Sequence, residues 1–329
     1  MNKIIFLLSC FFCVFLTAEA AAQTATPVAA GSIMDANDLV LDLSLRDGNA
    51  LIKPLLGVVS GPEAAQGSAG IDLTKHFLDV GITSIRNHDY LDDRLDIEQI
   101  LQVPDEKTYP SWLSADANNP KHYYWDESDE QIDKIIGGGF ELLLRLGGEA
   151  WCPQRPHAFH GPQDMVMEKN WMVAADNVLK RYKKWKGKTA LSYIAIWSEF
   201  PGVAYWDRTA QEFVAFWTKA INVFKYNHPD LKFGGPGFSA EATDEVRRGI
   251  SGVVAEFLKQ LYLRKTKPDW IGWHLYANDP SEALEAARAY ELLLAGKAPF
   301  QNVPWAGKFF FDEVTLLVDS YGVRTANEE

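Results

Sequence analysis

Short apolar runs alternate with longer amphipathic segments from Leu39 onward. The runs are the length of strands buried on both faces of a parallel sheet. The longer segments repeat apolar residues at helical spacing. This alternation predicts an α/β fold with crossover helices between parallel strands. Strands are expected over residues 54–60, 83–88, 141–146, 193–198, 232–235, 270–276 and 308–312, and helices over residues 71–80, 131–136, 171–185, 209–226, 246–263 and 281–294.

Seven β/α units in one domain favour a (β/α)8 TIM-type barrel, whose closure requires eight strands. Only residues 313–329 follow the last expected strand, too few for another helix and strand. The chain is therefore expected to lack the eighth β/α unit. Either the sequence is a C-terminally incomplete piece of a longer enzyme, or another segment closes the barrel.

The chain begins with the pattern of a secretory signal peptide. Lys3 precedes an apolar run over residues 4–16, and small residues follow at Ala18, Ala20 and Ala22. The run is too short to span a bilayer. We expect a signal peptide over residues 1–22, a flexible leader over 23–38 and the barrel domain over 39–329. The mature protein is then secreted or periplasmic, with no integral membrane segment.

Composition narrows the choice of partner. The formal net charge is -12 and is spread along the chain, which argues against nucleic acid as a partner. Aromatic residues make up 12% of the chain, including 11 Trp, and exposed aromatic rings suit stacking on sugars, although core packing uses most of them. Cys152 is the one cysteine outside the expected signal peptide. The scattered histidines do not indicate a metal site, and no cofactor is expected.

Polar residues follow the expected strands where a barrel carries its active site. A charged residue at such a position is costly unless it is paired or functional, and for any one of them a structural ion pair is the alternative. Two glutamates among them suit glycoside hydrolysis, which needs one carboxylic acid and one carboxylate. The set consists of Arg86, His88, Arg145, Ser198, Glu199, His274, Tyr276 and Glu313.

Six of the expected strands carry recognisable motifs. The segment Y-I-A-I-W-S-E-F-P-G (193–202) resembles the fourth-strand motif of clan A glycosidases, and K-F-F-F-D-E (308–313) resembles their seventh strand. The segments I-R-N-H (85–88), L-L-L-R-L-G-G-E (142–149), L-K-F-G-G-P (231–236) and D-W-I-G-W-H-L-Y (269–276) resemble, in order, the second, third, fifth and sixth strands of one family of that clan, glycoside hydrolase family 39. The resemblance covers residues 57–313.

The resemblance implies a retaining glycosidase with Glu199 as acid/base and Glu313 as nucleophile, their carboxyl groups about 5 Å apart. It implies that His274 and Tyr276 orient the nucleophile side or contact the sugar, and that Arg86 keeps the nucleophile ionised. His88, Arg145, Trp151 and Ser198 are further expected sugar contacts. Ser198 stands where the family usually has Asn, which puts rate or substrate class in doubt.

Two long loops, over residues 89–126 and 149–164, are expected to shape the substrate groove. A non-catalytic carbohydrate-binding barrel that takes part in exopolysaccharide handling remains the alternative to an enzyme. The sequence does not decide which sugar or linkage is cleaved, whether action is endo or exo, or the oligomeric state.

Overall fold

The computed structural model describes residues 4–6, 57–62, 71–87, 93–104, 114–148, 161–202, 205–279, 281–303, 306 and 315–322. All of them belong to one compact unit, which takes in residues 1–10 and 55–329. Among these residues, no helix is both long and apolar enough to cross a membrane.

Eight strands form one parallel sheet in the order β1-β10-β9-β8-β7-β4-β3-β2. A separate antiparallel pair joins β5 (Lys184–Trp185) to β6 (Lys188–Thr189). The strands of the main sheet are β1 (Ile4–Phe6), β2 (Gly57–Val59), β3 (Ser84–Arg86), β4 (Glu141–Leu146), β7 (Leu191–Ile196), β8 (Lys232–Phe238), β9 (Trp270–Tyr276) and β10 (Thr315–Gly322).

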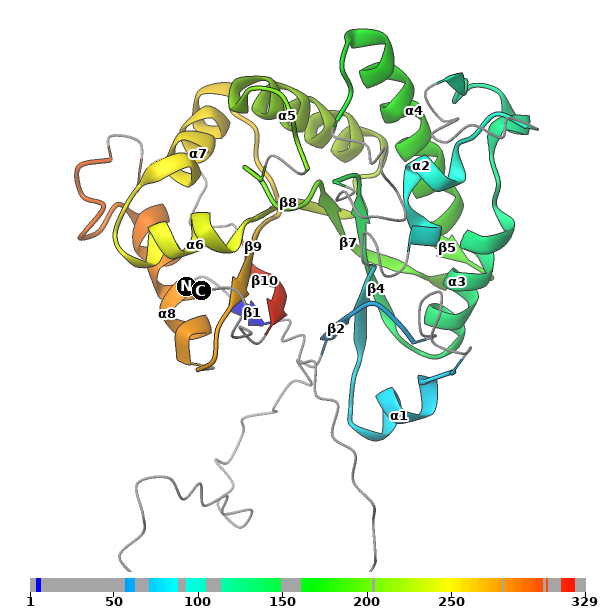
Figure 1. Cartoon of the computed structure of the whole chain (residues 1–329), viewed down its shortest axis with the longest axis horizontal. Coiled ribbons are helices and arrows are strands. Elements are labelled where there is room, and N and C mark those ends of the chain that lie inside the picture. The colour runs from blue at the N-terminus through cyan, green and yellow to red at the C-terminus, as the bar shows by residue number, and fades with distance from the viewer. Residues whose placement is uncertain are drawn as a thin grey trace, which may run out of the picture. The chain divides into compact units, whose positions relative to one another are not determined.

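The sheet curves with its helices on the outer side, as Figure 1 shows. Among the described residues, no pairing joins the edge strands β1 and β2, so the sheet is a partial (β/α)8 barrel. The helices are α1 (Thr74–Asp79), α2 (Ile97–Ile100), α3 (Asp126–Gly137), α4 (Met165–Tyr182), α5 (Ala210–Asn227), α6 (Ala240–Arg247), α7 (Gly252–Arg264) and α8 (Ser281–Ala295), with 3-10 turns η1 (Asp93–Leu95) and η3 (Pro120–His122).

Local sequence signals explain where the longest helices begin. Helix α5 starts with a capping box, in which Thr209 Oγ1 accepts from the backbone N–H of Glu212 and the Glu212 carboxylate accepts from that of Thr209. Helix α4 starts at Asp164, whose carboxylate accepts from the N–H groups of Val166 and Met167. These caps fix the helices that cover β4, β7 and β8.

The strands expected over residues 141–146 and 270–276 are confirmed, and two other expectations were wrong. The helix expected over 246–263 is divided into α6 and α7, because Gly249 and Gly252 adopt positive φ angles between them. The loop expected over 89–126 contains α2 and both 3-10 turns. The sheet gains an eighth strand from Ile4–Phe6, inside the expected signal peptide, where it pairs with Leu316, Leu317 and Val318 of β10.

The core has two parts. A large apolar cluster lies between the sheet and the helices, and a small one contains Leu143, Ala195 and Trp270, from three strands of the sheet. Trp270 and His274 lie four residues apart on β9 and therefore face the same side of the sheet. The side that buries Trp270 thus presents His274 near the carboxyl end of β9.

Candidate active site

Glu199 lies just beyond the carboxyl end of β7, on a constrained turn. Trp197 and Glu199 both have positive φ angles, 73° and 55°, which cost non-glycine residues about 1–3 kcal/mol each. The turn is held because Phe200 stacks on Phe213 of α5 with ring centroids 4.1 Å apart. The N–H of Gly202 also donates to the Glu199 carbonyl oxygen at 2.5 Å. These contacts direct one carboxylate to the carboxyl end of the sheet.

His274 of β9 contacts Glu199 through its Nδ1 atom and the carboxylate oxygen Oε1. The side chains are 4% and 14% exposed, so the pair is largely shielded from water while the carboxylate stays accessible. The resemblance implied that His274 serves the nucleophile side or the sugar. The structure shows a direct contact with the expected acid/base, and the implied role stays a prediction.

Arg86 and Ser198 form a second contact beside this pair. Arg86, at the end of β3, donates from Nη2 to Ser198 Oγ at 3.2 Å, and both residues are 3% exposed. The serine hydroxyl is therefore oriented by a cation. This contact joins the end of β3 to the residue that precedes Glu199.

Arg145 is placed differently from the other expected sugar contacts. Its side chain is 0% exposed, its Nη2 donates to Asp96 Oδ1 at 2.6 Å, and its Nη1 donates to the carbonyl oxygen of Gly147. Asn87 fastens the same strand, because its Oδ1 accepts from the Arg145 backbone N–H at 2.7 Å. The guanidinium is thus enclosed within the protein.

Asp96 and Glu98 are buried acids that the sequence analysis missed. Both are 1% exposed, and Glu98 Oε1 accepts from Trp171 Nε1 at 3.3 Å. Burial raises the pKa of the Glu98 carboxyl, although its own backbone N–H, Arg145 and Trp171 oppose the shift. The sequence signal that could have identified these acids is their position between apolar residues. The apolar residues are Leu95, Ile97 and Ile100, and all three are buried.

Of the remaining expected site residues, Tyr276 lies within the described part of the chain. Tyr276 ends β9 and is partly exposed. His88, Trp151 and Glu313 lie outside the described residues, as does the strand expected over 308–312. The described strand β10 begins at Thr315 and runs parallel to β9. The predicted separation of Glu199 and Glu313 therefore stays a prediction.

Some aromatic rings of the 89–126 loop serve packing. Tyr123 and Trp125 stack with centroids 4.9 Å apart, and Trp125 meets Tyr182 of α4 edge-on. The guanidinium of Arg181 lies 4.6 Å from the centroid of Trp125. Tyr124 is 49% exposed. These contacts give Trp125 a structural role between α3 and α4, whereas Tyr109 and Trp112 lie outside the described residues.

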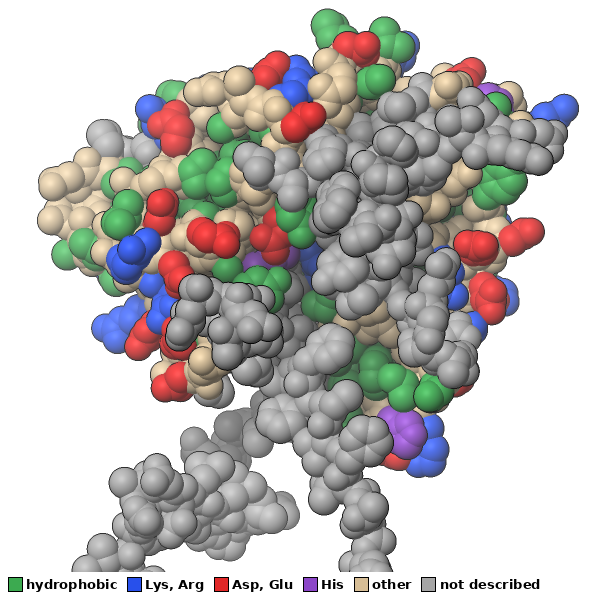
Figure 2. Space-filling view, in the orientation of Figure 1, with side chains coloured by type: hydrophobic (Ala, Val, Ile, Leu, Met, Phe, Trp, Pro, Cys, Tyr) green, Lys and Arg blue, Asp and Glu red, His purple; other side chains and the backbone are tan. Residues whose placement is uncertain are grey.

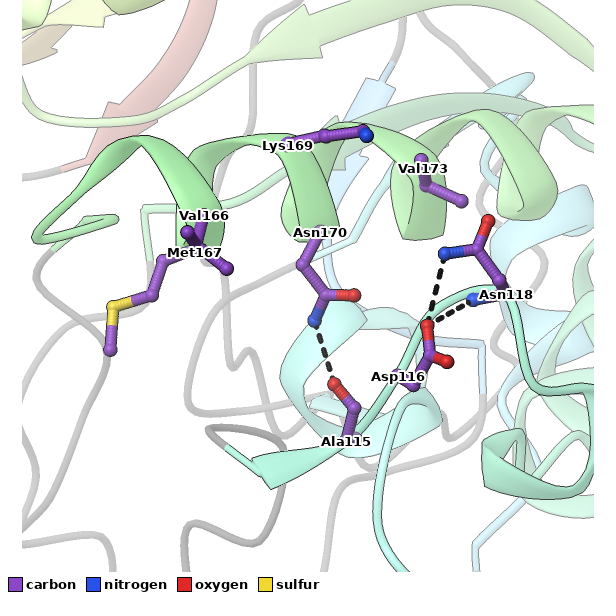
Figure 3. Close-up of a pocket in the computed structure, with 8 residues that line it drawn as sticks. All are labelled: Ala115, Asp116, Asn118, Val166, Met167, Lys169, Asn170 and Val173. Atoms are coloured by element: carbon purple, nitrogen blue, oxygen red, sulfur yellow. Dashed lines mark hydrogen bonds between the residues drawn. The ribbon is translucent and has the colours of Figure 1, made fainter.

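A cavity of about 340 Å³ lies between α4 and the segment before η3 (Figure 3). Its polar groups largely satisfy one another: Asn170 donates to the Ala115 carbonyl oxygen at 2.8 Å, and Asp116 accepts from the Asn118 backbone at 2.9 Å. These bonds fasten the segment to α4 and give the cavity no catalytic group. It is lined by Ala115, Asp116, Asn118, Val166, Met167, Lys169, Asn170 and Val173.

Acidic and basic side chains of the described residues are interspersed on the face drawn in Figure 2. Among the described residues, no group of three or more His, Cys, Asp or Glu side chains has the arrangement of a metal site.

No protein-family model matches this sequence, and no curated protein matches it significantly. Solved structures do match. A glucosidase from Croceicoccus marinus has 19% identity and a TM-score of 0.60, over 83% of this chain and 52% of that one. A GH39 β-xylosidase from Caulobacter crescentus has 15% identity and a TM-score of 0.53, over 78% and 50%. The catalytic core of a xylanase A has 10% identity and a TM-score of 0.53, over 83% and 72%.

The chain spans about half the length of the first two of these proteins. At such identities the similarity establishes the fold. This chain has a partial form of the (β/α)8 barrel fold of these solved structures, with Glu199 and His274 at the carboxyl end of its strands.

Proposed function

We propose that this protein is a retaining glycoside hydrolase that cleaves O-glycosidic bonds of a polysaccharide or oligosaccharide. The observation that carries the proposal is the contact of Glu199 with His274 at the carboxyl end of the sheet. A shielded yet accessible carboxyl group at that end suits an acid/base that must meet a glycosidic oxygen. The fold shared with glycosidases supports it.

In the proposed mechanism, Glu199 donates its proton to the leaving oxygen while a second carboxylate attacks the anomeric carbon. The Glu199 carboxylate then removes a proton from water, which releases the sugar from the second carboxylate with net retention. The contact with His274 Nδ1 holds one oxygen of Glu199 and leaves the other to face the substrate. The Arg86–Ser198 pair offers polar contacts to sugar hydroxyls.

The resemblance assigns the second carboxylate to Glu313. The register of β10 offers a comparison residue, Asp319, at the irregularity between Val318 and Ser320, which pair with Trp273 and His274. Asp319 therefore lies in β10 near the level of His274. We propose Glu313 as the nucleophile and use Asp319 as its matched control.

The test of hydrolysis is a panel of aryl glycosides, with the stereochemistry of the first product followed by NMR. We expect one anomer class to be hydrolysed with retention. Glu199→Ala should lose roughly 10²–10⁴-fold in rate with a poor leaving group. With an activated aryl glycoside, whose first step needs no acid, added azide should replace the activated water, restore turnover and give a glycosyl azide of retained configuration. Inversion by the wild-type protein would contradict the double-displacement mechanism.

The test of the nucleophile compares Glu313→Ala with Asp319→Ala. Azide added to Glu313→Ala should occupy the vacated site and give a glycosyl azide of inverted configuration, whereas Asp319→Ala should keep wild-type hydrolysis. The reverse result would transfer the nucleophile to Asp319. Sugar binding without hydrolysis across the panel would favour the carbohydrate-binding barrel.

Secretion or periplasmic location is part of the proposal, on the N-terminal sequence pattern.

A further inference from the structure

Arg145, which forms an enclosed ion pair with Asp96, also bonds the turn after β4, and this turn packs against the residues that precede Glu199. Arg145 bonds Asp96 on one side and the Gly147 carbonyl oxygen on the other, and both side chains are at most 1% exposed. Asp96 lies between η1 and α2, while Gly147 directly follows β4. The arginine thus ties the turn after β4 to the segment that follows β3.

That turn lies directly against the residues before Glu199. A Cβ atom at Gly147 would come within 2.5 Å of the Trp197 ring, and one at Gly148 within 2.5 Å of the Ser198 backbone nitrogen. Gly147 and Gly148 both have positive φ angles, near 77°. The Trp197 N–H also donates to the Leu146 carbonyl oxygen at 2.9 Å. The two backbones are therefore packed with no space between them.

From this arrangement we infer that Arg145, fixed by Asp96, is a positioning residue for the acid/base Glu199 and does not bind sugar. The inference rests on the proposed function and replaces the sequence prediction of Arg145 as a sugar contact. An enclosed guanidinium bonded to Asp96 and Gly147 has no face toward a substrate. Any movement of Gly147 and Gly148 is transmitted to Trp197 and Ser198, since interiors this tightly packed shift as units.

This role has a kinetic signature that a general structural role lacks. A displaced acid slows the cleavage of substrates whose leaving group needs a proton, whereas an activated leaving group such as dinitrophenolate departs without one. Loss of a sugar contact would instead raise KM for both substrates. The ratio of kcat/KM values for the two leaving groups, which reports the first step alone, therefore separates positioning from binding and from loss of folded protein.

The experiment uses the full chain with Arg145→Lys, which keeps the charge and loses the two-pronged geometry. We expect kcat/KM for the poor leaving group to fall by on the order of 10²-fold, as for a displacement of about 1 Å. The activated substrate should keep its kcat/KM, because its first step needs no acid; its kcat and KM should fall together, since Glu199 also activates water in the second step. The matched control is Arg181→Lys, which alters a bidentate pair between Arg181 of α4 and Asp129 of α3 and should leave the ratio unchanged.

A second variant and a second measurement keep the inference testable. If Arg145→Lys does not fold, Asp96→Glu retains the charge and displaces the arginine by one methylene group. The imidazole resonances of His274, assigned with His274→Ala, report the Glu199 contact without turnover. They should move in the Arg145 or Asp96 variant and stay fixed in Arg181→Lys, even if the wild-type protein hydrolyses nothing and the proposed function fails. Equal losses for both leaving groups, or unmoved resonances, would overturn the inference.

Discussion

The His274 imidazole and the Glu199 carboxylate meet across strands that are not neighbours, since β8 lies between β7 and β9. The contact is possible because Glu199 stands beyond the end of β7 while His274 lies within β9. Strand pairing thus fixes the histidine, and the strained turn 197–202 brings the carboxylate to it. The pair depends on both elements at once.

Replacement of His274 by Ala should impair the acid/base without removing it. We expect a loss of roughly 10- to 100-fold in kcat for poor leaving groups, because the Glu199 carboxyl is no longer held. Steady-state rates with matched aryl glycosides check this. His228→Ala is the control. His228 is also buried, and its Nε2 atom lies 2.9 Å from Oδ1 of Asp176 in α4. His228→Ala should lower stability without making the rate depend on the leaving group. If both variants show the same dependence on the leaving group, the role assigned to His274 is refuted.

Glu98 should make folding stability depend on pH. Burial raises the pKa of its carboxyl in the folded state, whereas the unfolded chain releases the proton at about pH 4.3. Folding therefore takes up a proton above that pH, and stability falls as the pH rises from the unfolded toward the folded pKa. Glu98→Gln keeps an acceptor for Trp171 and removes the titration.

As the pH rises from 4 to 8, the free energy of unfolding of the wild-type protein should fall relative to that of Glu98→Gln. The slope should reach at most about 1.4 kcal/mol per pH unit where the two forms differ by a full proton. Urea unfolding at several pH values measures it. Asp96→Asn, which leaves the enclosed Arg145 without its counter-charge, should destabilise at all these pH values. A constant difference for Glu98→Gln would show that the carboxyl is ionised in the fold.

Two glycines give a matched pair for packing. A Cβ atom at Gly234 would overlap the backbone oxygen and ring of Trp270, whereas one at Gly137, in the last turn of α3, meets nothing within 4 Å. Gly234→Ala should cost about 1–3 kcal/mol or more of unfolding free energy. Gly137→Ala should be neutral or stabilise by up to about 1 kcal/mol. Denaturant unfolding checks both, and equal effects would contradict the close contact with Trp270.

Periodicity was enough to predict most of the sheet, because residues 141–146 and 270–276 are apolar runs bounded by polar residues. It also placed Arg86, Ser198, Glu199 and His274 at one end of that sheet, since the ends of parallel strands coincide. The enclosure of Arg145 was not predictable, because its partner Asp96 lies 49 residues away in the sequence, in a segment between η1 and α2 that was expected to be a loop. The division between α6 and α7 was missed for a related reason: apolar spacing continues across Gly249 and Gly252.

The last prediction concerns Ile4–Phe6, which the structure pairs with β10 and the sequence assigns to a signal peptide. Upon export we expect cleavage after Ala20 or Ala22, to be read from the mass of the mature protein. Three residue pairs at a sheet edge add little, so a chain without residues 1–22 should unfold at the same temperature as the full chain. If the deletion lowers the unfolding midpoint by more than about 3 °C, roughly 1 kcal/mol for a domain of this size, β1 is a strand of the mature folded protein. An intact N-terminus on exported protein would exclude cleavage directly.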